Sequence, residues 1–454
     1  MVLKRCLIGL CAVLLVGAAR GPRLSRIEKL TRVLSLEDRR STGGGELERY
    51  LRDSDRSVRR RAILAAGRIA DRESIFSLIE LMNDSEHEVR QMAAFALGLI
   101  GDPRAVERLT ASLEDVDALV RGRSAEALGR IGDSRAAPAV ARMVQASLPP
   151  GSGLVTVRGD DPASLRDPWL EPRLGLFALA RFKDDPRAAR SVLLSGGRSR
   201  FDWWVATWTA MRLEDPGSRP VLLAAATSSD PLSRAYAARG LAAIADRESV
   251  ALLETLTLDE HTLVVVDALR ALGTLGGGRT AIVARLKDEQ PEHREEALKV
   301  LTRLPPERSL RARIVPLVGD EDAAVRTAAL AALAHTDPEG LALVLSGLDP
   351  DPMWFVRSDM ARELGEEGGE LAEAILFNML EHPDDMRLLP AVLEGLRLAR
   401  GGDAAETLRS FLEHADYGVR AAAAEGLGAL EATAATDAPG SSVSATTRRL
   451  NAVA

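Results

Sequence analysis

The hydrophobic positions of this chain recur in pairs of short helical stripes separated by polar turns. In two neighbouring segments, apolar side chains recur at i, i+3, i+4 and i+7, the spacing that gathers them on one face of a helix. The stripes consist of Ile75, Leu78, Ile79 and Met82, and of Val89, Ala93, Ala96, Leu97 and Ile100. The intervening Asn83-Asp84-Ser85-Glu86 supplies side chains that accept from free amides at a helix N-terminus. The pattern predicts two helices joined by a tight turn.

The same pair recurs along the chain with a period of about thirty-one residues. An Asp and an Arg six positions apart mark it, at Asp53/Arg59, Asp84/Arg90, Asp115/Arg121, Asp320/Arg326 and Asp351/Arg357. Neither helix of a pair buries its stripe alone, so neighbouring pairs must stack. The sequence therefore predicts an all-α solenoid of about twelve two-helix repeats, whose function resides on an extended surface.

This pattern resembles the HEAT-repeat family, and more closely the bacterial HEAT-like repeats of the phycobilisome lyase type. The resemblance covers residues 46–431. It implies a right-handed α-solenoid of the armadillo/HEAT type, with the second helix of each pair on the concave face. It also implies that the Asp and Arg residues form a structural ladder, in which each Arg reaches an Asp of its own or of the next repeat.

The repeats lose their regularity in two places. Between Arg121 and Arg234 we expect two degenerate repeats and an inserted loop at 147–168, because Pro149-Pro150-Gly151 and Asp161-Pro162 punctuate that stretch. Residues 432–454, rich in Thr, Ala, Ser and Gly, predict a disordered tail. At the other end, residues 20–45 predict an N-terminal helix and a Gly-rich linker.

Composition and the first residues add a compartment to this picture. Residues 1–19 have the basic start, apolar run and small residues of a secretory signal peptide, so we expect export to the periplasm or the exterior. Contact with a membrane would then be transient, through this segment. The net charge of −7 gives no general attraction to phosphate backbones, so nucleic acid is not expected as a partner.

No constellation of residues indicates catalysis. The sequence contains neither a Gly-x-Ser-x-Gly motif nor a phosphate-cradling Gly-rich loop, and both cysteines lie in the signal segment. Di-iron hydroxylases of the HEAT type place His-Glu directly after the ladder Arg, whereas this chain has Gln91-Met92 and Gly122-Arg123 there. We predict no catalytic residue, no metal site and no cofactor.

Aromatic residues gather in the degenerate repeats, although aromatics make up 4% of the chain. The cluster contains Trp169, Phe201, Trp203, Trp204 and Trp208, and the last two share a helix face. Two interpretations are open: large rings fill space where Ala-based packing is lost, or they form a hot spot for a partner on the concave face.

The sequence as a whole predicts an exported, non-catalytic scaffold that binds a protein or an extended peptide along its concave face. Two alternatives come from the resemblance. In one, the chain is the scaffold part of a cyclophilin-type peptidyl-prolyl isomerase whose catalytic domain lies outside these residues. In the other, the aromatic repeats bind a bilin, as in phycobilisome lyases.

Overall fold

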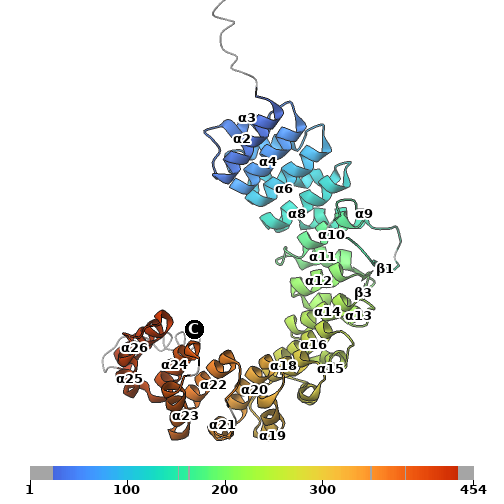
Figure 1. Ribbon diagram of the computed structural model, residues 1–454. Helices are drawn as coiled ribbons and strands as arrows, with labels where there is room; N and C mark the ends of the chain where they lie inside the picture. The colour runs from blue at the N-terminus through green and yellow to red at the C-terminus, as the bar shows by residue number, and fades with distance from the viewer. Residues whose placement is uncertain (1–23, 152, 162–163, 348–349, 384, 438–454) are drawn as a thin grey trace, which may run out of the picture. The chain divides into compact units, whose positions relative to one another are not determined.

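The computed structural model describes residues 24–151, 153–161, 164–347, 350–383 and 385–437. Within these ranges, a single helix, α2 (Arg26–Asp38), is followed by twelve helix pairs, which confirms the predicted all-α solenoid (Figure 1). The contacts divide the chain into two units, Met1–Ile244 and Ala245–Ala454, each with six of the pairs.

In most pairs of the first unit, a short first helix is followed by a longer second helix. The first helices are α3 (Glu46–Leu51), α5 (Ile75–Leu81), α7 (Val106–Ala111), α9 (Ala137–Ser147), α11 (Pro186–Leu193) and α13 (Arg219–Ala225). The second helices are α4 (Arg56–Ile69), α6 (His87–Ile100), α8 (Ala118–Ile131), α10 (Leu170–Leu179), α12 (Trp204–Leu213) and α14 (Pro231–Ala243). The second helices pack directly on one another along the unit (Figure 1).

The second unit repeats the arrangement. Its first helices are α15 (Val250–Leu256), α17 (Arg279–Ala284), α19 (Arg311–Ile314), α21 (Leu341–Leu345), α23 (Glu370–Glu381) and α25 (Ala405–Ser410). Its second helices are α16 (Thr262–Leu275), α18 (Pro291–Leu301), α20 (Ala323–Thr336), α22 (Trp354–Glu367), α24 (Leu389–Arg400) and α26 (Tyr417–Asp437).

Close packing of second helices explains the Ala- and Gly-rich composition. A Cβ added to Gly98 in α6 would lie 2.8 Å from the Cα of Ala127 in α8. The same contact recurs between Gly67 and Ala96 and between Gly129 and Ala178. At each layer the two backbones approach so closely that no larger side chain fits between them.

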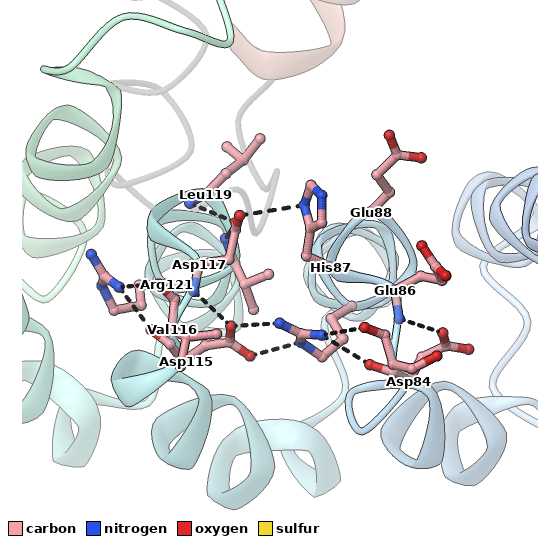
Figure 2. A network of polar contacts seen from close by, with 12 residues as sticks. Asp84, Glu86, His87, Glu88, Asp115, Val116, Asp117, Leu119 and Arg121 are labelled. Carbon is pink, nitrogen blue, oxygen red and sulfur yellow. Dashed lines mark hydrogen bonds and ion pairs between the residues drawn. The ribbon is translucent and has the colours of Figure 1, made fainter.

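The Asp and Arg of the repeat phrase hold neighbouring layers together. Arg90 donates one N–H to the main-chain carbonyl of Asp84, at 2.9 Å, and two to the carboxylate of Asp115 in the next repeat, both at 2.8 Å. Figure 2 shows this contact between Asp84 and Asp115, with the His87 imidazole 3.3 Å from Asp117 beside it. We call each such Arg-to-carboxylate contact a rung.

Rungs occur in both units. Arg59 joins the carbonyl of Asp53 to the carboxylate of Asp84, and Arg326 joins the carbonyl of Asp320 to the carboxylate of Asp351. Arg294 joins Asp288 to Asp320 in the same way. Each of these arginines therefore donates to the main-chain carbonyl of the Asp in its own repeat. Its ion pair is formed with the carboxylate of the Asp in the following repeat. The last predicted ladder residue, Arg357, is buried in α22.

The structure corrects the predicted fold at two points. Two predicted segments lie wholly or partly outside the described residues. Four two-residue strands interrupt the all-α fold, all near the inserted loop. The predicted tail does not begin at residue 432, because α26 continues to Asp437 through a run of Ala and Thr in which Ala favours helix. The predicted signal segment, 1–19, and residues 438–454 lie outside the described residues. Within the described ranges, none of the helices has the length and apolar character needed to cross a membrane.

Candidate binding surface at the aromatic repeats

Two enlarged turns distinguish the repeats α9–α10 and α11–α12 from the others. The residues between α9 and α10 contain β1 (Val155–Thr156), and those between α11 and α12 contain β2 (Leu194–Ser195), β3 (Arg198–Ser199) and β4 (Phe201–Asp202). Strands β2 and β3 form an antiparallel hairpin around Gly196 and Gly197, whose positive φ angles of 55° and 76° suit a two-residue turn that favours glycine. The strands lie beside α11 and α13 (Figure 1).

The two enlarged turns bind each other. Strand β1 pairs in parallel with β4, and the amides of Val155 and Val157 donate to the carbonyls of Arg200 and Asp202. Arg158 donates to the Asp202 carbonyl and forms an ion pair with its carboxylate. A further N–H of Arg158 reaches the Ser229 hydroxyl, 2.9 Å away, before α14. The inserted loop is thus attached to the two repeats that follow it.

A buried carboxylate attaches the loop to the second helices. Asp160 accepts from Arg173 at 3.0 Å and from the indole N–H groups of Trp203 and Trp204, both at 3.2 Å. Arg173 also forms an ion pair with Asp167, and the Arg173, Asp160 and Asp167 side chains are 3%, 7% and 4% exposed. We call these five residues the Asp160 network. Charges this deeply buried are stable only when they are paired and hydrogen-bonded, so the network positions the loop.

The ladder changes where the network begins. Arg121 still takes the carbonyl of Asp115, but its carboxylate partner is Glu171 of α10, at 2.7 and 2.8 Å. Directly before α12, Trp203 stands thirty-one residues before Arg234, where the repeat period places the ladder Arg. Trp203 is 1% exposed, and its ring lies 5.7 Å from that of Trp169. A tryptophan has replaced the ladder arginine as the connection between layers.

The five predicted site residues therefore divide into two groups. Phe201 and Trp203 are buried, at 4% and 1% exposure, so they pack the interior and offer no surface to a partner. Trp169, Trp204 and Trp208 are half-buried. The first group fits the packing interpretation, in which large rings fill the interior where Ala-based packing is lost.

The half-buried rings continue into the next repeat. Phe177 of α10 meets the edge of Trp208 at 4.8 Å between centroids, and Trp204 lies 6.1 Å from Phe177 and 6.4 Å from Tyr236 of α14. Aromatic pairs at these separations stabilise one another beyond the area they bury. A layer of rings therefore runs over α10, α12 and α14.

A groove opens at this layer of rings. It holds about 570 Å³ and is lined by Ala180, Arg181, Lys183, Trp208, Met211, Arg212, Tyr236 and Arg239. Four of these eight residues are basic, and the guanidinium carbon of Arg239 lies 5.6 Å from the centroid of Tyr236. We call this set of residues the aromatic groove. Trp, Tyr and Arg are the side chains most enriched at binding hot spots.

Burial and neighbouring charge act on the groove arginines. Burial lowers the pKa of Arg181, and the nearby guanidinium groups of Arg130 and Arg212 lower it further, against an opposing effect of Glu126. Glu126 itself accepts from Arg123 and Arg130. Lys183 is paired with Glu214 at 2.7 Å. Positive charge therefore exceeds negative charge at this end of the second helices.

Several of these residues were not predicted from the sequence. Asp167 and Arg173 have the six-residue spacing of the repeat phrase, which was a usable signal. The match between Ala127-Leu128-Gly129-Arg130 and Ala178-Leu179-Ala180-Arg181 could have placed Arg181 beside Arg130. Asp160 and Tyr236 carried no such signal, because their contacts join segments 43 or 32 residues apart, such as Asp160 to Trp203 and Trp204 to Tyr236.

A different hollow lies in the second unit. It holds about 410 Å³ among α21, α22 and α23, and its walls are mostly apolar, including Leu345, Met360, Ile375 and Met379. Within the described ranges, no group of three or more His, Cys, Asp or Glu side chains could hold a metal ion. The aromatic groove differs from this hollow because four basic side chains and two aromatic rings line it.

The fold defines the protein as an α-solenoid of two-helix repeats. The family of HEAT repeats matches residues 46–129, 77–150, 219–283 and 279–365, which together cover more than half of the chain. The chain belongs to the HEAT-repeat family.

Many solved structures are similar to this chain, among them the following three. An engineered protein is 20% identical, over 85% of this chain and 98% of that chain, with a TM-score of 0.36. The complex of CpcE and CpcF of phycocyanin lyase from Nostoc sp. PCC7120 is 20% identical, over 70% and 96%, with a TM-score of 0.28. A mutant of Kap121p is 12% identical, over 90% and 58%, with a TM-score of 0.45. Among curated proteins, none matches this chain.

Proposed function

We propose that this protein is an exported, non-catalytic HEAT-repeat scaffold that binds a protein or an extended peptide along its second helices. This is the face that the family is expected to turn to its concave side. Export is supported by the signal-like residues 1–19. The lack of a catalytic role is proposed because the sequence contains neither a Gly-x-Ser-x-Gly motif nor a phosphate-cradling Gly-rich loop.

The aromatic groove carries the proposal. In the regular repeats, the ladder arginines form ion pairs with the next layer, as Arg90 and Arg326 do. In the groove, half-buried Trp208 and Tyr236 lie beside exposed Arg181 and Arg212. A ring that is half-buried on its own protein can complete its burial against a partner, which is the way that most hot spots gain affinity.

The experiment is a crosslinking pull-down from the native envelope with the full chain as bait. A variant carrying Trp208→Ala and Tyr236→Ala is compared with Phe76→Ala. Phe76 is 62% exposed on α5, far along the unit from the groove and in the other helix layer, so it is a matched loss of an exposed ring. Captured proteins are quantified by mass spectrometry.

We expect the groove variant to lose at least about tenfold in the amount of one specific captured protein, since truncated hot spots cost 2 kcal/mol or more. Phe76→Ala should capture as the wild type does. Thermal melting of both variants should stay close to that of the wild type. Equal capture by the groove variant would show that the partner does not bind there.

A further inference from the structure

Three arginines occupy equivalent positions in successive repeats of the first unit. Gly98 meets Ala127 and Gly129 meets Ala178 in the same way, so α8 and α10 are in register and Arg181 corresponds to Arg130. Arg212 of α12 follows Arg181 by thirty-one residues, one repeat period. We call Arg130, Arg181 and Arg212 the arginine row. Helices α8, α10 and α12 pack on one another in that order, so the row crosses three neighbouring layers.

The row has clear ends. One repeat before Arg130 the equivalent residue is Leu99, and one repeat after Arg212 it is Ala243. Three charges, spaced one layer apart, therefore form a bounded set. All three side chains are exposed to solvent.

Two of the three row arginines differ from the ladder arginines in lacking a carboxylate partner. Each rung arginine takes two oxygens of a carboxylate, as Arg90 does from Asp115. Among the described residues, no carboxylate lies within ion-pair distance of Arg181 or Arg212, and Arg130 shares Glu126 with Arg123. Partial burial and the neighbouring guanidinium groups of Arg130 and Arg212 lower the pKa of Arg181. A carboxylate paired with Arg181 would offset this repulsion.

The aromatic groove lies directly beside this row. Arg181 and Arg212 belong to its lining, together with Trp208, Met211 and Tyr236. A ligand that neutralises the arginines would also cover these apolar surfaces. This combination suits a chain that carries carboxylates and apolar stems, rather than a small inorganic anion.

The spacing of the row indicates the conformation of that chain. Packed helices lie about 8–10 Å apart, so we expect arginines at equivalent positions of neighbouring layers to lie about that far apart. A peptide in the polyproline II conformation has three residues per turn and rises about 3.1 Å per residue, so every third side chain points the same way at intervals of about 9 Å. Three carboxylates at every third residue would meet the three guanidinium groups in turn.

Charge favours a peptide over a nucleic acid. A polyphosphate needs an extended field of positive charge, whereas this chain has a net charge of −7 and the row contains three arginines. Glu126 and Glu214 also lie close to the row and would repel a continuous line of phosphates. Separate carboxylates avoid these two positions.

We infer that the groove binds an extended acidic segment of a partner protein, about seven residues long, whose carboxylates at every third position pair with Arg130, Arg181 and Arg212. This inference rests on the proposed function, because it names the partner chemistry of the same surface. Bidentate pairing of guanidinium and carboxylate supplies both the affinity and the register.

Two labelled peptides of identical composition test the spacing. One is Glu-Pro-Pro-Glu-Pro-Pro-Glu, which holds the polyproline II conformation and presents a carboxylate at every third residue. The other is Pro-Pro-Glu-Glu-Glu-Pro-Pro. Their binding to the full chain is measured by fluorescence anisotropy at low salt, beside single-stranded oligothymidylate of similar length.

The full chain should bind the spaced peptide at least about fivefold more tightly than the blocked one, and salt should weaken binding. Arg181→Glu and Arg212→Glu should each weaken it about tenfold or more. Arg142→Glu, a reversal of an exposed arginine on α9 in the same repeats, should change it less than about twofold. Equal binding of the two peptides, or no effect of the row variants, would overturn the inference. So would tighter binding of oligothymidylate that the same variants abolish, since a nucleic acid would then be the ligand.

The pull-down separates this inference from the proposed function. If Trp208→Ala with Tyr236→Ala abolishes capture while Arg181→Glu with Arg212→Glu leaves it intact, the scaffold function stands and the acidic partner is wrong. If capture survives both sets of changes, the partner binds elsewhere, and the aromatic groove fails as the site of the proposed function as well.

Discussion

The ladder repeats α3–α8 and the aromatic repeats α9–α14 are built on the same stack of second helices but use their arginines differently. In the ladder repeats, Arg59 and Arg90 lie inside the structure and join one layer to the next, with side chains 15% and 12% exposed. In the aromatic repeats, Trp203 takes the interior position of the ladder arginine, while Arg181 and Arg212 face the solvent.

This difference shows that neighbouring layers of one repeat stack can be connected in two ways. The layers must be connected, but the connection can be a rung, or it can be a buried ring and the Asp160 network. The exposed arginines Arg181 and Arg212 stand near the ends of the second helices, at a position different from that of the ladder arginines.

Trp203→Ala should cause the largest loss of stability. It removes a fully buried ring and its hydrogen bond to Asp160, which we expect to cost about 3–5 kcal/mol in urea-induced unfolding. Trp208→Ala should cost about 1 kcal/mol, chiefly its edge contact with Phe177. Similar losses for the two variants would contradict the division of the cluster into interior and surface rings.

Arg173→Met tests the Asp160 network. It leaves the carboxylates of Asp160 and Asp167 buried without their cation, so the free energy of unfolding should fall by about 3–5 kcal/mol. The matched control is Arg158→Met, whose ion pair with Asp202 is 41% exposed on the arginine side and should contribute at most about 1 kcal/mol. A small loss for Arg173→Met would show that the loop does not depend on this network.

Arg90→Ala and Arg212→Ala compare a ladder arginine with a row arginine. The first should lower the free energy of unfolding by about 1–3 kcal/mol at pH 7, and the second should leave it nearly unchanged. Burial by itself would raise the pKa of Asp115, but hydrogen bonds from Arg90 and from the amide of Asp117 outweigh burial and lower it.

A carboxyl group with a lowered folded pKa stabilises the fold above its ordinary pKa, and this contribution is lost as the pH falls through the folded value. The difference between the wild type and Arg90→Ala should therefore be complete at pH 7 and shrink below the ordinary value of 3.8. The difference for Arg212→Ala should stay near zero throughout. Urea unfolding at a series of pH values measures both, and a difference for Arg90→Ala that does not change with pH would argue against the rung.

Gly129→Ala tests the junction between the two regions, with the smallest expected effect. The added methyl group would lie 2.6 Å from the Cα of Ala178, so α8 and α10 must separate, at a net cost of about 1 kcal/mol. Gly428→Ala is the control, because this helical glycine has open space around it and alanine favours helix by about 1 kcal/mol. The two changes should shift the melting temperature in opposite directions. A stabilising Gly129→Ala would mean that the layers are not tightly packed there.

Local pattern was enough to predict most of the fold. The stripes at 75–82 and 89–100 predict α5 and α6, and the thirty-one-residue period predicts the twelve pairs, because each repeat contacts mainly its neighbours. The end of the last helix was less predictable, since the Ala-rich residues after Glu431 suit both a helix and a tail. Strands β1 and β4 escaped prediction because two residues carry no period.

The sequence by itself determined the architecture and the positions where it is irregular: a HEAT-type α-solenoid, an Asp-Arg phrase, and a break with a loop and a group of tryptophans. Only the tertiary structure decided which tryptophans are interior, that Asp160 accepts from two of them, and that Arg181 and Arg212 have no carboxylate partner among the described residues. The reason is physical. Helix periodicity is a local property of the chain, whereas the burial of a ring or the lack of a partner for a charge depends on residues tens of positions away that come together only when the layers stack.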